Sequence, residues 1–292
     1  MRLFKGSGVA LITPFKYGEV DYERLKRLID FHVENETDAL IIAGTTGEAS
    51  TLSKDEKKAL YEFSVNYVDG RLPVIVGTGG NNTKDVIELS KFAEAVGCDG
   101  LLIVTPYYNK TTQEGLIKHF TVIADSVSIP IIMYNVPNRT GLNMKPSTVE
   151  KLSVHPNIAG IKEASGDITQ ITEIAKYASE NFYLYSGNDD HILPVLALGG
   201  KGVISVVANI LPKDVHDLCF AYFLGNIDKA REIQLNLFDL IRLLFIETNP
   251  IPVKEAMALL GLDTGEVRLP LIRMTEKNKE LLINEMKNLG LL

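Results

Sequence analysis

The chain has 292 residues, of which 46% are hydrophobic and 23% are charged, and its formal net charge is −7. Such a composition is typical of one large globular domain, or of a domain with an appendage, and the negative charge argues against nucleic acid or an anionic membrane as a partner. Cys98 and Cys219 form no CxxC motif, and no apolar run approaches the ~20 residues of a membrane helix. We therefore expect reduced thiols and a cytoplasmic protein.

Eight short apolar runs alternate with helical patterns, which is the rhythm of βα units. Several runs are apolar at every residue, as expected of parallel strands that are buried on both faces. The runs cover residues 9–12, 39–43, 74–76, 101–104, 131–134, 158–161, 183–185 and 203–207. Eight strands, each followed by a helix, favour a closed (β/α)₈ barrel over an open doubly wound sheet.

Capping sequences mark the starts of several helices between these runs. A Ser, Thr or Asp that is followed three residues later by Glu or Gln can bind the first free backbone N–H groups of a helix. Such pairs occur at Ser53/Glu56, Thr111/Glu114, Ser147/Glu150 and Asp167/Gln170.

Beyond the eighth strand the pattern is helical, with apolar periodicity over residues 230–246 and 277–289. We expect the last barrel helix over residues 212–224. The predicted organisation is a catalytic barrel of residues 1–224 followed by a helical appendage of residues 225–292.

Lys162 is the candidate nucleophile, because it follows the sixth apolar run directly, where a buried strand would reach the mouth of the barrel. Burial disfavours the ammonium form and lowers its pKa, which leaves a neutral amine able to attack a carbonyl carbon. The alternative is a lysine that simply reaches solvent from a strand end, so the neighbouring strand ends decide between the two.

The other strand ends supply hydroxyl groups and a cation. Tyr134 lies on the strand next to Lys162, and we expect a nearby cation to lower its pKa so that it can shuttle protons. Thr45 and Tyr108 could complete a hydroxyl relay, and Arg139 offers a forked donor to a carboxylate. Together these groups suit imine chemistry on a keto acid.

Two other kinds of barrel enzyme fit the sequence less well. Phosphate sites use the loops after the seventh and eighth strands, but the first loop here is acidic, with Asp189 and Asp190, and the second, residues 208–212, has no glycine. A divalent metal needs clustered His, Asp and Glu, whereas the five histidines are scattered and none ends a strand. We therefore expect no sugar phosphate, no metal and no cofactor beyond the imine on Lys162.

At its strand ends the sequence resembles the dihydrodipicolinate synthase family, within the pyruvate-dependent class I aldolases that include N-acetylneuraminate lyase. The resemblance extends over nearly the whole chain, including the helical tail. The matching motifs are Gly44-Thr45-Thr46-Gly47-Glu48, Thr105-Pro106-Tyr107-Tyr108-Asn109, Tyr134-Asn135-Val136-Pro137 with Arg139-Thr140-Gly141, and Gly160-Ile161-Lys162-Glu163-Ala164-Ser165-Gly166.

The resemblance implies that Lys162 forms an imine with pyruvate and that the resulting enamine attacks L-aspartate 4-semialdehyde. The product would be 4-hydroxy-tetrahydrodipicolinate, on the route to diaminopimelate and lysine. The resemblance assigns the proton relay to Tyr134, Thr45 and Tyr108, with Tyr108 reaching in from a neighbouring subunit.

It also assigns the substrate contacts. Thr46 would hold the pyruvate carboxylate, Arg139 would hold the carboxylate of the semialdehyde, and Gly187 and Ile204 would line the pyruvate pocket. Because the lyase for sialic acid usually lacks the Arg139 equivalent, the synthase is favoured. The resemblance further implies a homo-oligomer, a tight dimer that is most often doubled into a tetramer.

Family members that are inhibited by lysine bind it at the dimer interface, at positions matching Ala49, Ser50, Lys54, Lys57, Asn81, Asp85 and Tyr107. Inhibited members commonly carry histidine or an acidic residue at the Lys54 position, and often histidine at the Lys57 position. Two cations there would repel the ammonium group of lysine, so we expect weak or absent inhibition by lysine.

Two alternatives stay open at this point. One is a related pyruvate aldolase that acts on another aldehyde, and the other is a catalytically silent barrel that binds a keto acid. The intact set of lysine and hydroxyl groups argues against the silent barrel.

Overall fold

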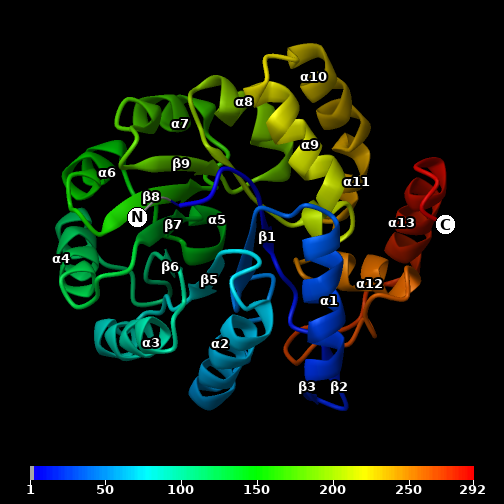
Figure 1. Ribbon diagram of the computed structural model, residues 1–292, viewed down its shortest axis with the longest axis horizontal. Coiled ribbons are helices and arrows are strands. Elements are labelled where there is room, and N and C mark those ends of the chain that lie inside the picture. Colours follow the sequence, from blue (N-terminus) through cyan, green and yellow to red (C-terminus); the bar gives the residue numbers. More distant parts are fainter. Residues whose placement is uncertain (1–2) are drawn as a thin grey trace.

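A closed barrel of eight parallel strands forms the centre of the computed structural model, which describes residues 3–292 (Figure 1). The strand order around the barrel is β1, β10, β9, β8, β7, β6, β5 and β4, and β4 pairs with β1 to close it. The strands are β1 (Gly6–Ala10), β4 (Ala39–Ile42), β5 (Val74–Gly77), β6 (Gly100–Val104), β7 (Ile131–Asn135), β8 (Ile158–Glu163), β9 (Tyr183–Ser186) and β10 (Gly202–Ser205). The predicted (β/α)₈ barrel is confirmed.

The first strand begins earlier than its apolar pattern predicted, at Gly6 instead of residue 9. The first residues of the strand include Gly6 and Gly8, which do not count as apolar in the pattern. Both positions need a residue without a side chain, because a Cβ there would clash. A Cβ at Gly6 would lie 2.2 Å from Asp38 Oδ2, and a Cβ at Gly8 would lie 2.5 Å from the ring of Phe4. Crowding of the backbone, which an apolar pattern does not reveal, therefore accompanies the start of this strand.

Helices surround the barrel on all sides (Figure 1). They are α1 (Tyr22–Glu34), α2 (Lys54–Val68), α3 (Thr83–Ala95), α4 (Gln113–Ala124), α5 (Pro137–Thr140), α6 (Pro146–Ser153), α7 (Ile168–Ala175), α8 (Ile192–Ala197) and α9 (Pro212–Phe223). Short 3₁₀ turns, η1 (Asp189–His191) and η2 (Val207–Asn209), follow β9 and β10, and a small hairpin, β2 (Phe15–Lys16) and β3 (Glu19–Val20), follows β1.

Two of the four predicted helix caps are confirmed. Ser53 forms the full capping box at the start of α2, and the Asp167 side chain accepts backbone N–H groups at the start of α7. The other two were wrong. Thr112 takes the cap of α4 in place of Thr111, and α6 starts at Pro146, which is favoured in a first helical turn because it has no N–H to satisfy.

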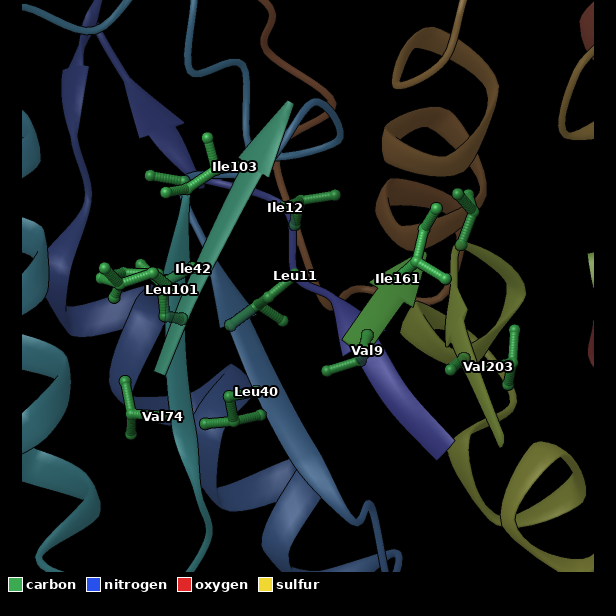
Figure 2. Close-up of a cluster of buried hydrophobic side chains, with 14 of the residues drawn as sticks. Val9, Leu11, Ile12, Leu40, Ile42, Val74, Leu101, Ile103, Ile161 and Val203 are labelled. Atoms are coloured by element: carbon green, nitrogen blue, oxygen red, sulfur yellow. The ribbon is translucent and has the colours of Figure 1, made fainter. Parts of the chain in front are cut away.

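The core has two layers, which fix the direction of the site residues. Figure 2 shows the outer layer between strands and helices, to which Leu40, Leu101 and Ile161 belong. The inner layer fills the barrel and includes Tyr134 and Ile204. Because successive side chains of a strand point to opposite faces, an outward Ile161 directs Lys162 into the barrel.

The C-terminal part consists of α10 (Ile227–Asn236), α11 (Phe238–Leu243), α12 (Ile251–Leu259) and α13 (Glu276–Asn288). The expected helical stretch over residues 230–246 is thus two short helices. In Figure 1, α13 lies at the edge of the molecule, and the segment between α12 and α13 lies beside the β2–β3 hairpin. Arg268 Nε donates to Gly18 O there at 2.9 Å.

The division into two domains after residue 224 stays a prediction, although α9 ends close to it, at Phe223. No helix within residues 3–292 combines the length and the apolar character that crossing a membrane requires.

Candidate active site

Lys162 and Tyr134 meet at the mouth of the barrel, because β7 and β8 pair with Tyr134 opposite Lys162. Lys162 Nζ lies 4.4 Å from the centre of the Tyr134 ring, and Lys162 is only 5% exposed. Burial lowers the pKa of Lys162 to about 7, with Asp189 acting to raise it and Arg139 acting to lower it. A large fraction of the amine is therefore neutral near pH 7, as a nucleophile requires.

The expectation that a cation lowers the pKa of Tyr134 was wrong in direction. Burial raises the pKa of Tyr134 and outweighs Arg139 and a hydrogen bond with Thr45, which both act to lower it. The phenol is therefore protonated at neutral pH and is set up to donate a proton before it accepts one.

A cavity of about 270 Å³ opens at the mouth and joins two groups of predicted residues. Its lining includes catalytic and substrate-binding candidates, Thr45, Tyr134 and Arg139, and expected interface residues, Ala49, Ser50, Lys57 and Tyr107. Lys162 is not among the lining residues, but its Nζ lies 4.4 Å from the ring centre of Tyr134, which is one of them.

Lys54 and Lys57, both on α2, have different surroundings. Lys54 Nζ lies 2.6 Å from Asp85 Oδ1 and 3.3 Å from Glu88 Oε2, so carboxylates compensate its charge. Lys57 lines the cavity, and burial, together with the charge of Lys54, lowers its pKa. The expected repulsion of a lysine ligand therefore depends on Lys57 and not on two cations.

Tyr107 and Tyr108 follow β6 in a loop that Asn81 holds. Asn81 Nδ2 donates to Tyr107 O at 3.3 Å, and Asn81 O accepts from Asn109 Nδ2 at 3.0 Å. Tyr107 lines the cavity, whereas Tyr108 is 92% exposed and has a left-handed backbone with φ of 68°. Such a conformation costs a bulky residue about 1–3 kcal/mol, and strain of this kind is common at functional sites.

Gly187 lies next to Lys162 and Ile204 lies inside the barrel, but neither is among the residues that line the cavity, so their place in a pyruvate pocket stays a prediction. A Cβ at Gly187, directly after β9, would lie 3.1 Å from Lys162 Cγ and 2.6 Å from Ala164 Cβ, so glycine leaves room for the lysine. Ile204 on β10 belongs to the apolar cluster inside the barrel that also contains Tyr134.

Asn249, whose role no sequence pattern indicated, connects two of the predicted substrate-binding residues. Its Nδ2 donates to Thr46 Oγ1 at 3.0 Å, and its backbone carbonyl accepts from Arg139 Nη2 at 3.2 Å. Thr46 and Asn249 are both buried. The segment before α12 therefore helps to position both residues, across separations of 203 and 110 residues.

A buried ion pair, which the sequence also failed to indicate, anchors the turn that carries Thr45 and Thr46. Lys254 Nζ on α12 lies 2.7 Å from Glu48 Oε1, and both side chains are buried. Glu48 Oε2 also accepts the backbone N–H of Arg268 at 3.0 Å. Burial lowers the pKa of Lys254 while Glu48 acts to raise it, so this lysine, unlike Lys162, has a carboxylate partner in direct contact.

A barrel whose mouth combines a buried amine of lowered pKa, a protonated phenol and an arginine is suited to forming imines with carbonyl substrates. The arrangement therefore defines a class of lysine-dependent barrel enzymes.

Comparison with known proteins agrees with this class. The model of the dihydrodipicolinate synthetase family matches residues 3–289. The 4-hydroxy-tetrahydrodipicolinate synthase of Caldicellulosiruptor bescii is 58% identical over 292 residues, which cover 100% of this chain and 99% of that protein. The enzyme of the same name from Clostridium tetani is 55% identical over 293 residues and is covered completely, as is this chain.

Among solved structures, dihydrodipicolinate synthase from Acinetobacter baumannii complexed with pyruvate is similar with a TM-score of 0.95 and 42% identity over 99% of each chain. The chain belongs to the dihydrodipicolinate synthetase family. The full-length relatives confirm the expected lyase activity, that of a 4-hydroxy-tetrahydrodipicolinate synthase.

Proposed function

We propose that the protein condenses pyruvate with L-aspartate 4-semialdehyde through an imine on Lys162. The observation that carries this proposal is the buried amine of Lys162, whose pKa is about 7 and which lies 4.4 Å from the ring centre of Tyr134. Attack of Nζ on the keto carbon and loss of water give the imine, and loss of a methyl proton gives the enamine. The enamine carbon then attacks the aldehyde, and ring closure by the substrate amine frees Lys162.

The remaining groups take roles that their surroundings support. The phenol of Tyr134, hydrogen-bonded to Thr45, supplies the proton that leaves with water when the imine forms. Thr46, oriented by Asn249, binds the pyruvate carboxylate, and Gly187 and Ile204 shape the pocket.

Borohydride trapping with pyruvate, followed by peptide mapping, tests the proposal. One reduced pyruvate adduct on Lys162 is expected. Lys254 serves as an internal control in the same digest, because it is also buried but is paired with Glu48. An adduct on another lysine, or no adduct although pyruvate binds, would refute the assignment of Lys162.

We infer a homo-oligomer, a dimer of dimers, in which Tyr108 completes the relay of the partner subunit. Its exposure and its strained backbone support this role. Mixing inactive Lys162→Met chains with Tyr108→Phe chains should restore activity, because the heterodimer contains one site with both an intact lysine and an intact tyrosine. If each chain used its own Tyr108, mixing would restore nothing. Sedimentation of the mixture checks that the chains have exchanged.

Arg139→Ala should spare imine formation with pyruvate and lower the condensation rate by about 10²-fold or more, because the semialdehyde carboxylate loses its charged partner. Arg139 also acts to lower the pKa of Lys162, so trapping is followed against pH for both proteins and the two are compared on the plateau that each reaches at high pH. Trapping and steady-state rates separate the two steps. An equal loss of both steps would contradict the assigned role of Arg139.

Lysine should inhibit weakly or not at all, since Lys57, which has no carboxylate partner within residues 3–292, lines the part of the cavity where the ligand would bind, and its positive charge would repel the ligand. A steady-state assay with lysine from the micromolar to the millimolar range checks this. Half-inhibition below 1 mM would show that the charge of Lys57 does not exclude the ligand.

A further inference from the structure

Asp189 is a buried carboxylate at the barrel mouth that the mechanism above does not use. It begins η1, which follows β9, and it is 2% exposed. Its Oδ2 accepts the backbone N–H groups of Val206 and Val207, both at 2.9 Å. Its Oδ1 is buried and makes no hydrogen bond of good geometry within residues 3–292, although the Ser205 hydroxyl is near enough to the carboxyl to act on its pKa.

The turn that carries Asp189 is also held from outside the barrel. Gln234 Nε2 on α10 donates to Asp189 O at 3.0 Å, and Gln234 Oε1 accepts from Leu193 N at 3.1 Å. Capping the two N–H groups needs only one neutral oxygen, which an asparagine would supply without the cost of burying a charge. Capping alone therefore does not explain why this residue is an aspartate, or what its second carboxylate oxygen does.

The position of the turn brings the carboxylate into the electrostatic range of the nucleophile. Gly187, two residues before Asp189, packs against the Lys162 side chain. Asp189 is the acid that acts to raise the pKa of Lys162. Arg139 from α5 acts to lower the pKa of Lys162. Burial raises the pKa of Asp189, while its hydrogen bonds and the charge of Lys162 act to lower it. Asp189 also acts to raise the pKa of Cys219 on α9, which burial already raises.

We propose that Asp189 is the counter-ion for the cationic nitrogen that forms on Lys162 during the reaction. This inference rests on the imine mechanism proposed above. Condensation of the amine with the keto carbon, with loss of water, gives an iminium with a positive nitrogen. Loss of a methyl proton leaves its electron pair as a new C=C bond and moves the C=N π pair onto nitrogen, which becomes neutral. The positive charge returns when the enamine carbon bonds to the aldehyde carbon.

Each cationic state lies inside the barrel, where a fixed carboxylate stabilises charge far better than in water. The carboxylate of Asp189 can stabilise the positive nitrogen without moving, because Val206, Val207 and Gln234 already hold its turn in place. Asp189 acts through Lys162, so it is a positioning residue and not a catalytic one.

Asp189→Asn tests the role, because it removes the charge and keeps an oxygen for Val206 and Val207. The rising limb of borohydride trapping against pH should move down by about one pH unit, since the group that raises the pKa of Lys162 is gone. The pyruvate concentration for half-trapping should rise about tenfold. Asp190→Asn makes the same charge change on the exposed neighbour and should leave both quantities unchanged.

Thermal unfolding of each variant separates these effects from loss of the fold. If Asp189→Asn does not fold, Asp189→Ser, whose hydroxyl can still accept an N–H, takes its place. The counter-ion role would be overturned if the rising limb of trapping for Asp189→Asn lay at the same pH as in the wild type and Asp190→Asn, or at a higher pH. Asp189 would then only cap η2. Failure of the wild type to form any adduct on Lys162 would instead refute the proposed mechanism.

Discussion

Replacing Lys162 with methionine is expected to lower kcat/KM for pyruvate by about 10⁴-fold or more, because the reaction loses the atom that forms the imine. Methionine is close to lysine in length and has no charge to bury, so the barrel should keep its fold. Steady-state kinetics with the semialdehyde in excess give the rate, and trapping with borohydride should detect no adduct.

Lys201→Met is the matched control, since Lys201 precedes β10 at the opposite end of the barrel and pairs with Glu180 at 3.0 Å. Its kcat/KM should equal that of the wild type. Residual turnover of Lys162→Met within tenfold of the wild type would rule out a covalent mechanism through this lysine.

Lys254→Met is expected to destabilise the protein by about 3–5 kcal/mol, because it leaves the Glu48 carboxylate buried without its cation. The double variant Lys254→Met/Glu48→Gln, which buries no unpaired charge, should recover much of that loss. The free energy of unfolding from urea titration measures both effects. Activity should fall with the single variant as well, because Glu48 ends the turn that carries Thr45 and Thr46.

The surface pair of Lys151 and Glu114, 3.1 Å apart and well exposed, is the control for this stability change. Lys151→Met should cost no more than about 1 kcal/mol. If Lys254→Met lowered the free energy of unfolding by no more than Lys151→Met does, the buried ion pair would not anchor the turn. Other contacts would then hold Thr45 and Thr46 in position.

The barrel and the set of residues at its mouth were predictable because both follow from local patterns. Apolar runs specify buried strands, and the carboxyl ends of parallel strands meet at one edge, so Lys162, Tyr134 and Thr45 come together once the fold is known. The pairing of Tyr134 with Lys162 confirms that neighbouring runs became neighbouring strands.

The remaining features depend on tertiary contacts that no local pattern carries. Asn249 reaches Thr46, and Lys254 reaches Glu48, across more than 200 residues, and in sequence they are only a loop asparagine and a helix lysine. The direction of the Tyr134 pKa shift depends on how deeply the ring is buried, and the pattern indicated only that a cation was near. In sequence Asp189 is one of two neighbouring loop acids, and no local pattern indicates that it is buried while Asp190 is exposed.

The contacts of Asn249 and Lys254 also set the order in which the site can mature during synthesis. A nascent chain emerges from the ribosome with its N-terminus first, so all eight barrel strands, the last of which ends at Ser205, are available before either residue appears. Until then Thr46 has no amide donor from Asn249 and Glu48 has no cation. The contacts of Thr46 and Glu48 are therefore completed late in translation, and a chain that stops after the barrel would lack both of them.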